Sequence, residues 1–173
     1  MRSSNPSDAP PCVAVPDERL RLIVESYRRL TGKELVGAAS AAISPQCNDT
    51  FATEVAPTIL RHALWNAPHA IVAHGTEADP VFFYGNRLAL ELFGMGFEEF
   101  ARLPSRLSAE PLAQEAREKL LEQVMRQGYV DGYSGVRIAK DGSRFTIADC
   151  TVWNLADKAG GLRGQAAVFV PQL

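Results

Sequence analysis

Residues 128–147 read GYVDGYSGVRIAKDGSRFTI and decide the fold of this chain. Branched and aromatic residues recur on both sides of an Asp-Gly pair, a combination typical of a β-hairpin. We therefore expect a strand over residues 129–140, a two-residue turn at Asp141 and Gly142, and a partner strand over residues 143–155.

A two-residue turn would fix the register of this hairpin, and alternation would then assign each side chain to a face. The expected core face carries the larger apolar pairs: Ile138 opposite Phe145, Val136 opposite Ile147, and Val130 opposite Trp153. The other face is smaller and more polar: Arg137 opposite Thr146, Gly135 opposite Ala148, and Tyr133 opposite Cys150. Its charge is too low for full exposure, so we expect the N-terminal helices, or else a second protomer, to cover it. A β-bulge would reverse the assignment beyond it.

Further short elements are expected on both sides of the hairpin. Periodicity and turn residues predict strands over residues 69–73, 81–84 and 164–170, and helices from Asn86 to Gly94, over 97–102 and over 112–127. Upstream, helical spacing of apolar residues predicts helices over residues 17–31 and 53–65, with Asp17 as an N-cap and Gly32 as the stop of the first. Residues 1–16 are rich in Ser, Pro and Asp and are expected to form a flexible tail.

Composition excludes several classes of protein. The formal net charge of -2 gives no basis for nucleic-acid binding, which relies on a surplus of positive charge. The 3 cysteines form no CxxC pair, and the N-terminus lacks the apolar core of a secretion signal. No apolar run has the roughly 20 residues that a membrane span needs. We expect a cytoplasmic protein that binds neither nucleic acid nor membrane.

Three segments resemble PAS domains in their order of strands, short helices and a Lys-Asp-Gly hairpin: VFFYGNRLALELFGMGFEEF at 81–100, the hairpin at 128–147, and GGLRGQAAVFV at 160–170. More specifically, LPSRLSAEP at 103–111, DGYSGVRIA at 131–139 and TVWNLADKAGGLRGQAAVF at 151–169 resemble the MEKHLA family of PAS-like domains.

The resemblance implies an α+β fold, with a five-stranded antiparallel sheet flanked by short helices and an N-terminal helical extension. It divides the chain into the tail at residues 1–16, the helical extension at 17–66 and the PAS-like domain at 67–173. It also implies ligand sensing, regulation or self-association, and it carries over no catalytic residues.

A PAS-like fold would contain a pocket, and five residues are candidates to contact a ligand there: Arg106, Tyr133, Arg137, Phe93 and Trp153. Arg106 has the planar fork that binds carboxylate or phosphate. The competing structural interpretations are that Arg106 pairs with Glu110, that Tyr133 and Arg137 stack on an N-terminal helix, and that Phe93 and Trp153 are core residues. Asp149 is expected on the apolar face, hydrogen-bonded to Ser134.

The searches for cofactor and metal sites give no candidate that we would adopt. The segment Gly85-Asn86-Arg87 lacks the reactive thiol of a flavin photosensor, and Cys150 has no basic sequence neighbour to activate it. The histidines at 62, 69 and 74 are expected at the surface or at strand edges, and not as haem or metal ligands. We expect no cofactor.

The sequence thus favours a non-catalytic sensory, regulatory or protein-interaction module with a small-molecule ligand in its pocket. Its partner would be a second copy of the chain or a separate signalling protein. Two alternatives remain open. One is a small-molecule enzyme that uses a pocket near Arg106, Tyr133 and Arg137, because a fold does not determine a reaction. The other is a self-association module with a filled core, in which no cavity is left around Gly135 and Ala148.

Overall fold

A computed structural model describes residues 14–37 and 50–172. Its five strands form one antiparallel sheet in the order β2-β1-β5-β4-β3, which confirms the expected α+β, PAS-like architecture. The strands are β1 (Ala70–His74), β2 (Phe82–Gly85), β3 (Tyr129–Ile138), β4 (Arg144–Ala156) and β5 (Leu162–Gln172). The helices are α1 (Asp17–Thr31), α3 (Thr50–Trp65), α4 (Arg87–Phe93), α5 (Phe97–Phe100), η3 (Ser105–Ser108) and α6 (Pro111–Gln127). The predicted tail lies outside the described residues up to position 13, as do residues 38–49 between the two N-terminal helices.

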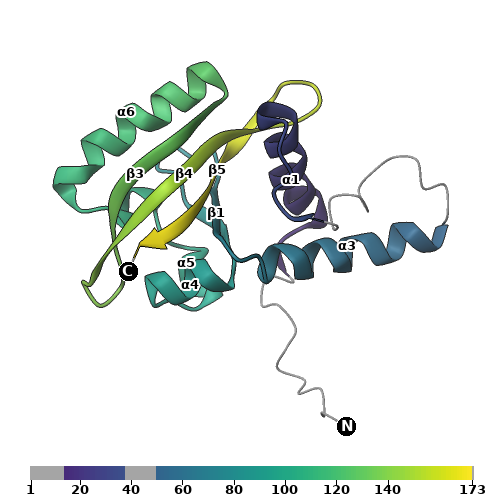
Figure 1. Cartoon of the computed structure of the whole chain (residues 1–173), viewed down its shortest axis with the longest axis horizontal. Helices are drawn as coiled ribbons and strands as arrows, with labels where there is room; N and C mark the ends of the chain where they lie inside the picture. The colour runs from purple at the N-terminus through teal and green to yellow at the C-terminus, as the bar shows by residue number, and fades with distance from the viewer. Residues whose placement is uncertain (1–13, 38–49, 173) are drawn as a thin grey trace, which may run out of the picture.

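Helices cover both faces of the sheet, as Figure 1 shows: α1 lies against one face and α6 against the other, with α4 and α5 beside the lower end. None of the helices within residues 14–37 and 50–172 combines the length and the hydrophobicity of a membrane-spanning segment.

The predicted register of the β3–β4 hairpin is wrong by one residue next to the turn, whereas the predicted pair Tyr133–Cys150 is present because the register shifts on either side of Tyr133. Arg137 faces Phe145 and Gly135 faces Ile147, because the connection has three residues and not two. The Ala139 N–H donates to the Ser143 carbonyl at 2.8 Å, and Gly142 closes the loop in a left-handed conformation with φ 85°. Such a three-residue loop with a glycine in the left-handed region is the next most common hairpin connection after the two-residue turn.

This slip of one residue reverses the faces of β3. Val136 is 41% exposed, whereas Arg137 on the opposite side of the strand is 9% exposed. The side chains that sequence analysis assigned to the polar face of β3 therefore point into the protein interior. Since a register shift of one moves every side chain of a strand to the other face, a single loop residue has this large effect.

A β-bulge in β4 makes a second correction. The pairing of β4 with β5 shifts between Ala148 and Thr151, and Asp149 has a φ of 47°. Asp149 is exposed, so the prediction that it is buried beside Ser134 is wrong. The bulge also separates Ile147 from Trp153, which lie on opposite faces although the sequence pattern placed them on one.

The face that carries Trp153 is covered by α1. Trp153 is fully buried, its indole N–H donates to Ser26 Oγ at 3.0 Å, and its ring packs edge-on against Tyr27 with 4.9 Å between ring centroids. An N-terminal helix thus packs on the sheet, as expected. It does so on the face opposite Arg137, whose own face is covered by α6 and the short helices.

The ends of the helices follow capping rules in part. Gly32 ends α1 in a left-handed conformation with φ 71°, as predicted, whereas Asp17 is the first helical residue and not the N-cap. Asn86 is the predicted N-cap of α4, and its Oδ1 accepts from the Ala89 N–H at 3.1 Å. The same side chain also binds the backbone at the start of β1. Its Oδ1 accepts from the Ile71 N–H at 3.0 Å, and its Nδ2 donates to the His69 carbonyl at 2.8 Å. Asn86 therefore fixes α4 to the sheet beside the interior space described next.

Candidate functional site

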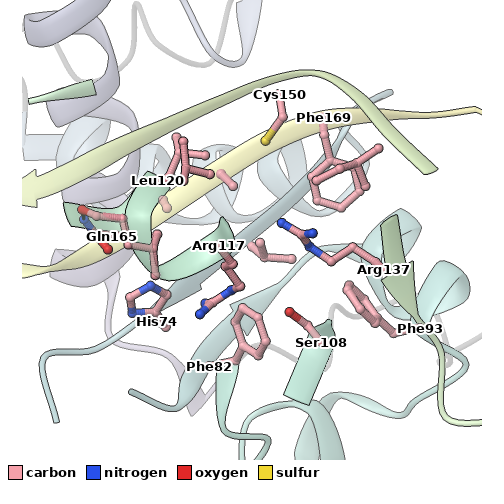
Figure 2. A pocket seen from close by; sticks show the side chains of 16 residues that line it. His74, Phe82, Phe93, Ser108, Arg117, Leu120, Arg137, Cys150, Gln165 and Phe169 are labelled. Atoms are coloured by element: carbon pink, nitrogen blue, oxygen red, sulfur yellow. Dashed lines mark hydrogen bonds between the residues drawn. The ribbon is translucent and has the colours of Figure 1, made fainter. Parts of the chain in front are cut away.

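An interior cavity of about 50 Å³ lies between the sheet and the helices α4, η3 and α6. One water requires about 10–15 Å³ of such space, so the cavity accommodates about four water-sized groups. Figure 2 shows the side chains around it. The lining residues are mostly apolar with a few polar groups: Val72, His74, Phe82, Phe93, Ser108, Arg117, Leu120, Leu121, Arg137, Ile147, Cys150, Val152, Gln165, Ala166, Ala167 and Phe169.

Two arginines reach this cavity from different elements. Arg117 extends from α6 and is 8% exposed, and Arg137 extends from β3 and is 9% exposed. Burial, and to a lesser extent the positive charge of Arg137, lower the pKa of Arg117 to about 10. The two guanidinium groups are therefore close enough to repel each other inside the protein.

Neither arginine forms an ion pair or hydrogen bond with an acid among the described residues, and the only carboxylate that acts on Arg117 there is that of its sequence neighbour Glu118, whose attraction is smaller than the effect of burial. Arg137 donates from Nη1 to the carbonyl of its neighbour Val136 at 3.0 Å, and its guanidinium lies 5.7 Å from the centre of the Tyr133 ring. Arg117 forms no hydrogen bond or ion pair with any residue of the described ranges, and no Asp or Glu side chain is part of the described cavity wall. A buried charge without a partner is costly, so this arrangement calls for a counter-charge.

His74, at the end of β1, is the third polar group without a full set of partners. It is 7% exposed, and its Nδ1 lies 2.9 Å from the Gly75 carbonyl, to which it donates. The tautomer with the proton on Nδ1 leaves Nε2 as an acceptor, and Nε2 has no hydrogen-bond partner in the described structure. Burial lowers the pKa of His74, and the charge of Arg117 lowers it further, which favours this neutral form.

The remaining polar groups of the wall are satisfied or inert. Ser108 Oγ donates to the Ser105 carbonyl at 2.7 Å, and Gln165 Nε2 donates to the Leu121 carbonyl at 3.2 Å and to Asn154 Oδ1 at 3.1 Å. Burial raises the pKa of the Cys150 thiol to about 12, so Cys150 is a neutral thiol and not a nucleophilic thiolate. The unmatched polar groups of the cavity are thus concentrated in the two arginines and the histidine.

The five ligand-binding candidates from the sequence are dispersed. Phe93 and Arg137 line the cavity, and Tyr133 lies beneath the Arg137 guanidinium. Arg106 is exposed and pairs with Asp79 at 3.1 Å, whereas its expected partner Glu110 pairs with a different arginine. Trp153 is on the opposite face of the sheet, under α1. Whether any of the five binds a ligand stays a prediction.

Sequence analysis missed Arg117 and His74. Arg117 comes three residues before the buried Leu120 on the helix predicted over residues 112–127, and this helical spacing was a weak signal that its side chain faces the interior. His74 was expected at a strand edge, and only the pairing of β1 between β2 and β5 buries it. Within residues 14–37 and 50–172, no three His, Cys, Asp or Glu side chains are placed so that they could share a metal ion.

Solved structures with a similar fold are PAS and light-oxygen-voltage (LOV) domains. A PAS domain from Colwellia psychrerythraea superposes with a TM-score of 0.56 and 18% identity, over 64% of this chain and 91% of that one. A LOV domain studied with a flavin analogue superposes with a TM-score of 0.52 and 23% identity, over 66% of this chain and 84% of that one. An RNA-binding LOV receptor superposes with a TM-score of 0.57 and 18% identity, over 73% of this chain but only 35% of that one. At these identities the comparisons show the fold.

The described cavity does not fit a flavin. Pockets for ligands of that size usually measure about 300–1,000 Å³, several times the volume found here. The wall also places the Arg117 side chain and a neutral, buried Cys150 thiol in this space. We therefore derive no flavin chemistry from the likeness to LOV domains.

Sequence comparison identifies the family. No curated protein sequence matches the chain. The model of the MEKHLA domain matches residues 17–171, which includes α1 and all five strands. The match therefore begins at the first helix and extends well upstream of residues 81–170, where the resemblance of sequence motifs is strongest. The chain belongs to the MEKHLA domain family.

Proposed function

We propose that this chain is a sensory module that binds a small molecule in the cavity between the sheet and α6 and reports its presence to another protein chain. Membership of the MEKHLA family and the PAS-like fold favour a sensory signalling role. The observation that carries the ligand-binding part is the wall of the cavity, where Arg117, Arg137 and His74 are at least nine-tenths buried and His74 Nε2 has no partner. Buried polar groups are normally paired, so their partner is a bound molecule.

The proposal is for binding and not for a reaction. A nucleophilic mechanism needs a nucleophile hydrogen-bonded to a base that is itself oriented by a third group. In the described part of the chain, Ser108 donates to a backbone carbonyl, and no hydrogen bond joins Ser108, Cys150 and His74. The neutral thiol of Cys150 adds no activated nucleophile.

Strand β4 offers a route from the cavity to the surface. Cys150 and Val152 line the cavity, whereas Thr151 and Trp153 alternate with them and face the other side. There, Trp153 bonds to α1. Thr151 Oγ1 donates to Asp131 at 2.6 Å, and the Asp131 carboxylate pairs with Lys33 just after α1 at 3.2 Å.

A ligand that moves β4 would therefore change how α1 packs, and the populations of two packings would shift with ligand concentration. We expect the receiving partner to contact α1 and to be a second copy of the chain or a separate signalling protein.

Native mass spectrometry of the gently purified protein, compared with its denatured mass, tests this function. We expect an excess mass that disappears on denaturation and that is absent in Cys150→Leu, where a larger side chain fills the cavity. Met125→Leu on the exposed side of α6 is the matched control and should keep the excess mass. A dimer without excess mass would contradict ligand sensing in favour of self-association, and a monomer without excess mass would contradict a retained ligand.

A further inference from the structure

The cavity wall shows an imbalance of charge, because two buried arginines line it and no Asp or Glu side chain does in the described structure. Other arginines pair with acids near the surface: Arg106 with Asp79, Arg144 with Glu110, and Arg163 with Asp157. Arg117 and Arg137 are more deeply buried than these three and have no carboxylate partner in the described structure. Because the cost of an unpaired charge rises with burial, the distribution of acids is the reverse of what folding stability alone would favour.

Two neighbouring guanidinium groups are a receptor for an oxyanion. Each presents a planar fork of N–H donors that matches the two oxygens of a carboxylate, and such bonds between charged groups are stronger than neutral ones. Figure 2 shows Arg117, Arg137 and His74 around one interior space, with the apolar rings of Phe82 and Phe93 beside it. The space accommodates about four water-sized groups, which is the size of a carboxylate with one or two further atoms.

We infer that the cavity binds a small carboxylate, whose oxygens accept hydrogen bonds from Arg117 and Arg137. This inference rests on the proposed function, whose ligand class it specifies. The apolar part of the wall favours a carboxylate with a short carbon chain over phosphate, which needs donors on all sides. His74 Nε2 is an acceptor without a partner, and a hydroxyl on the carbon next to the carboxylate would donate to it. The best ligand is therefore a short 2-hydroxy acid.

Thermal unfolding and isothermal calorimetry with four probes test the inference at constant ionic strength: sodium acetate, sodium glycolate, sodium phosphate and acetamide. Acetamide has the shape of acetate without its charge. We expect both carboxylates to give saturable calorimetric isotherms and to raise the Tm by about 5–10 °C at a concentration about 100-fold above Kd, and acetamide to have no effect. Glycolate should bind several-fold more tightly than acetate. Stabilisation by phosphate alone, or by none of the probes, would overturn the inference.

Variants assign the effect to the two arginines. Arg117→Met and Arg137→Met should each weaken glycolate binding at least tenfold. Arg106→Met removes an arginine that is exposed and paired with Asp79, and it should leave binding unchanged. His74→Leu should reduce glycolate binding to the level of acetate. If either methionine variant does not fold, Arg117→Lys or Arg137→Lys keeps the charge without the fork, and a loss of at least tenfold is again expected.

Two results separate this inference from the proposed function. If native mass spectrometry finds a neutral retained molecule while none of the anions stabilises the protein, the carboxylate assignment is wrong and the sensory function stands. If no retained molecule is found and no probe binds, both are wrong. Equal binding by wild type, Arg117→Met and Arg137→Met would place the anion elsewhere and overturn the inference.

Discussion

The two faces of the sheet differ in how completely their polar groups are satisfied. On the face under α1, the buried indole N–H of Trp153 has a partner in Ser26, and Tyr27 packs against the ring. On the face under α6, two buried arginines form no ion pair with an acid in the described structure, and the Nε2 of His74 has no hydrogen-bond partner there. Both faces are formed by the same strands, and β4 contributes alternate residues to each.

This contrast indicates that the face under α1 contributes mainly to stability and that the face under α6 is suited to binding. A satisfied and close-packed face contributes to folding, because every buried group has exchanged water for a protein partner. A face with unpaired charges reduces stability and is retained where another molecule completes it. The comparison predicts that substitutions on the α1 face lower stability, whereas substitutions of the buried charges on the cavity face raise it.

The largest effect is expected from Trp153→Ala. Trp153 is fully buried between the sheet and α1, so truncation leaves a cavity and removes the contact with Tyr27. We expect the free energy of unfolding to fall by about 3–5 kcal/mol. Urea denaturation measures this, with the exposed Met125→Ala as a control near zero. A loss below 1 kcal/mol would show that the α1 face is not the stabilising one.

A smaller loss is expected from Ser26→Ala. Ser26 is fully buried, and its hydroxyl accepts the Trp153 indole N–H. Removal of the hydroxyl leaves that N–H without a partner, which costs about 1–3 kcal/mol. Trp153→Phe combined with Ser26→Ala should restore part of the loss, because both partners are then gone. An additive double variant would contradict this hydrogen bond.

On the cavity face, a substitution of a buried charge should raise the free energy of unfolding instead of lowering it. Arg117→Met replaces an unpaired buried guanidinium by an apolar side chain of similar length, beside Leu120 and Phe82. We expect the free energy of unfolding of the ligand-free protein to rise by about 1–2 kcal/mol, the lower part of the range for replacing buried charges. Denaturation after extensive dialysis measures it. A decrease would mean that Arg117 stabilises the fold and would remove the contrast between the faces.

The smallest effect concerns His74 and pH. Burial lowers its folded-state pKa below the usual value of 6.5, so below pH 6.5 the unfolded chain binds a proton that the folded chain resists. Stability should therefore be full above pH 6.5 and decline as the pH falls from there through the lowered pKa. Thermal unfolding from pH 7.5 to 5 should show this decline in the wild type, and His74→Gln should reduce it. Parallel pH curves for the two proteins would contradict the prediction.

Much of the fold was predictable because local signals agreed with the tertiary structure. Gly32 ends α1 and Asn86 caps α4 as their residue types predict, and the strands lie within a few residues of the expected ranges. The faces of the hairpin were not predictable. The residues Asp141-Gly142 suit a two-residue turn and a three-residue loop equally, and the choice between them reverses β3.

The candidate site was predictable only in part for the same reason. Arg137 was identified, yet on a face expected to meet the N-terminal helices, and the bulge at Asp149 places Trp153 on the face opposite Ile147 and the cavity. Arg117 and His74 line one cavity only in the folded protein, where α6 packs on β3 and β4, because α6 and β1 are distant in the sequence. Periodicity reports burial of an arginine poorly, because the same spacing also suits an exposed one.

The most direct test observes the arginines themselves. In a nitrogen-15 NMR titration of the whole protein with glycolate, we expect the Nε–Hε signals of Arg117 and Arg137 to shift together and to saturate at one concentration. Those of Arg106 and Arg144, which are paired at the surface, should not move. Saturable shifts at the buried pair would show that the cavity face is completed by a ligand. Unchanged signals at Arg117 and Arg137 would contradict the account, because that face would then be complete without one.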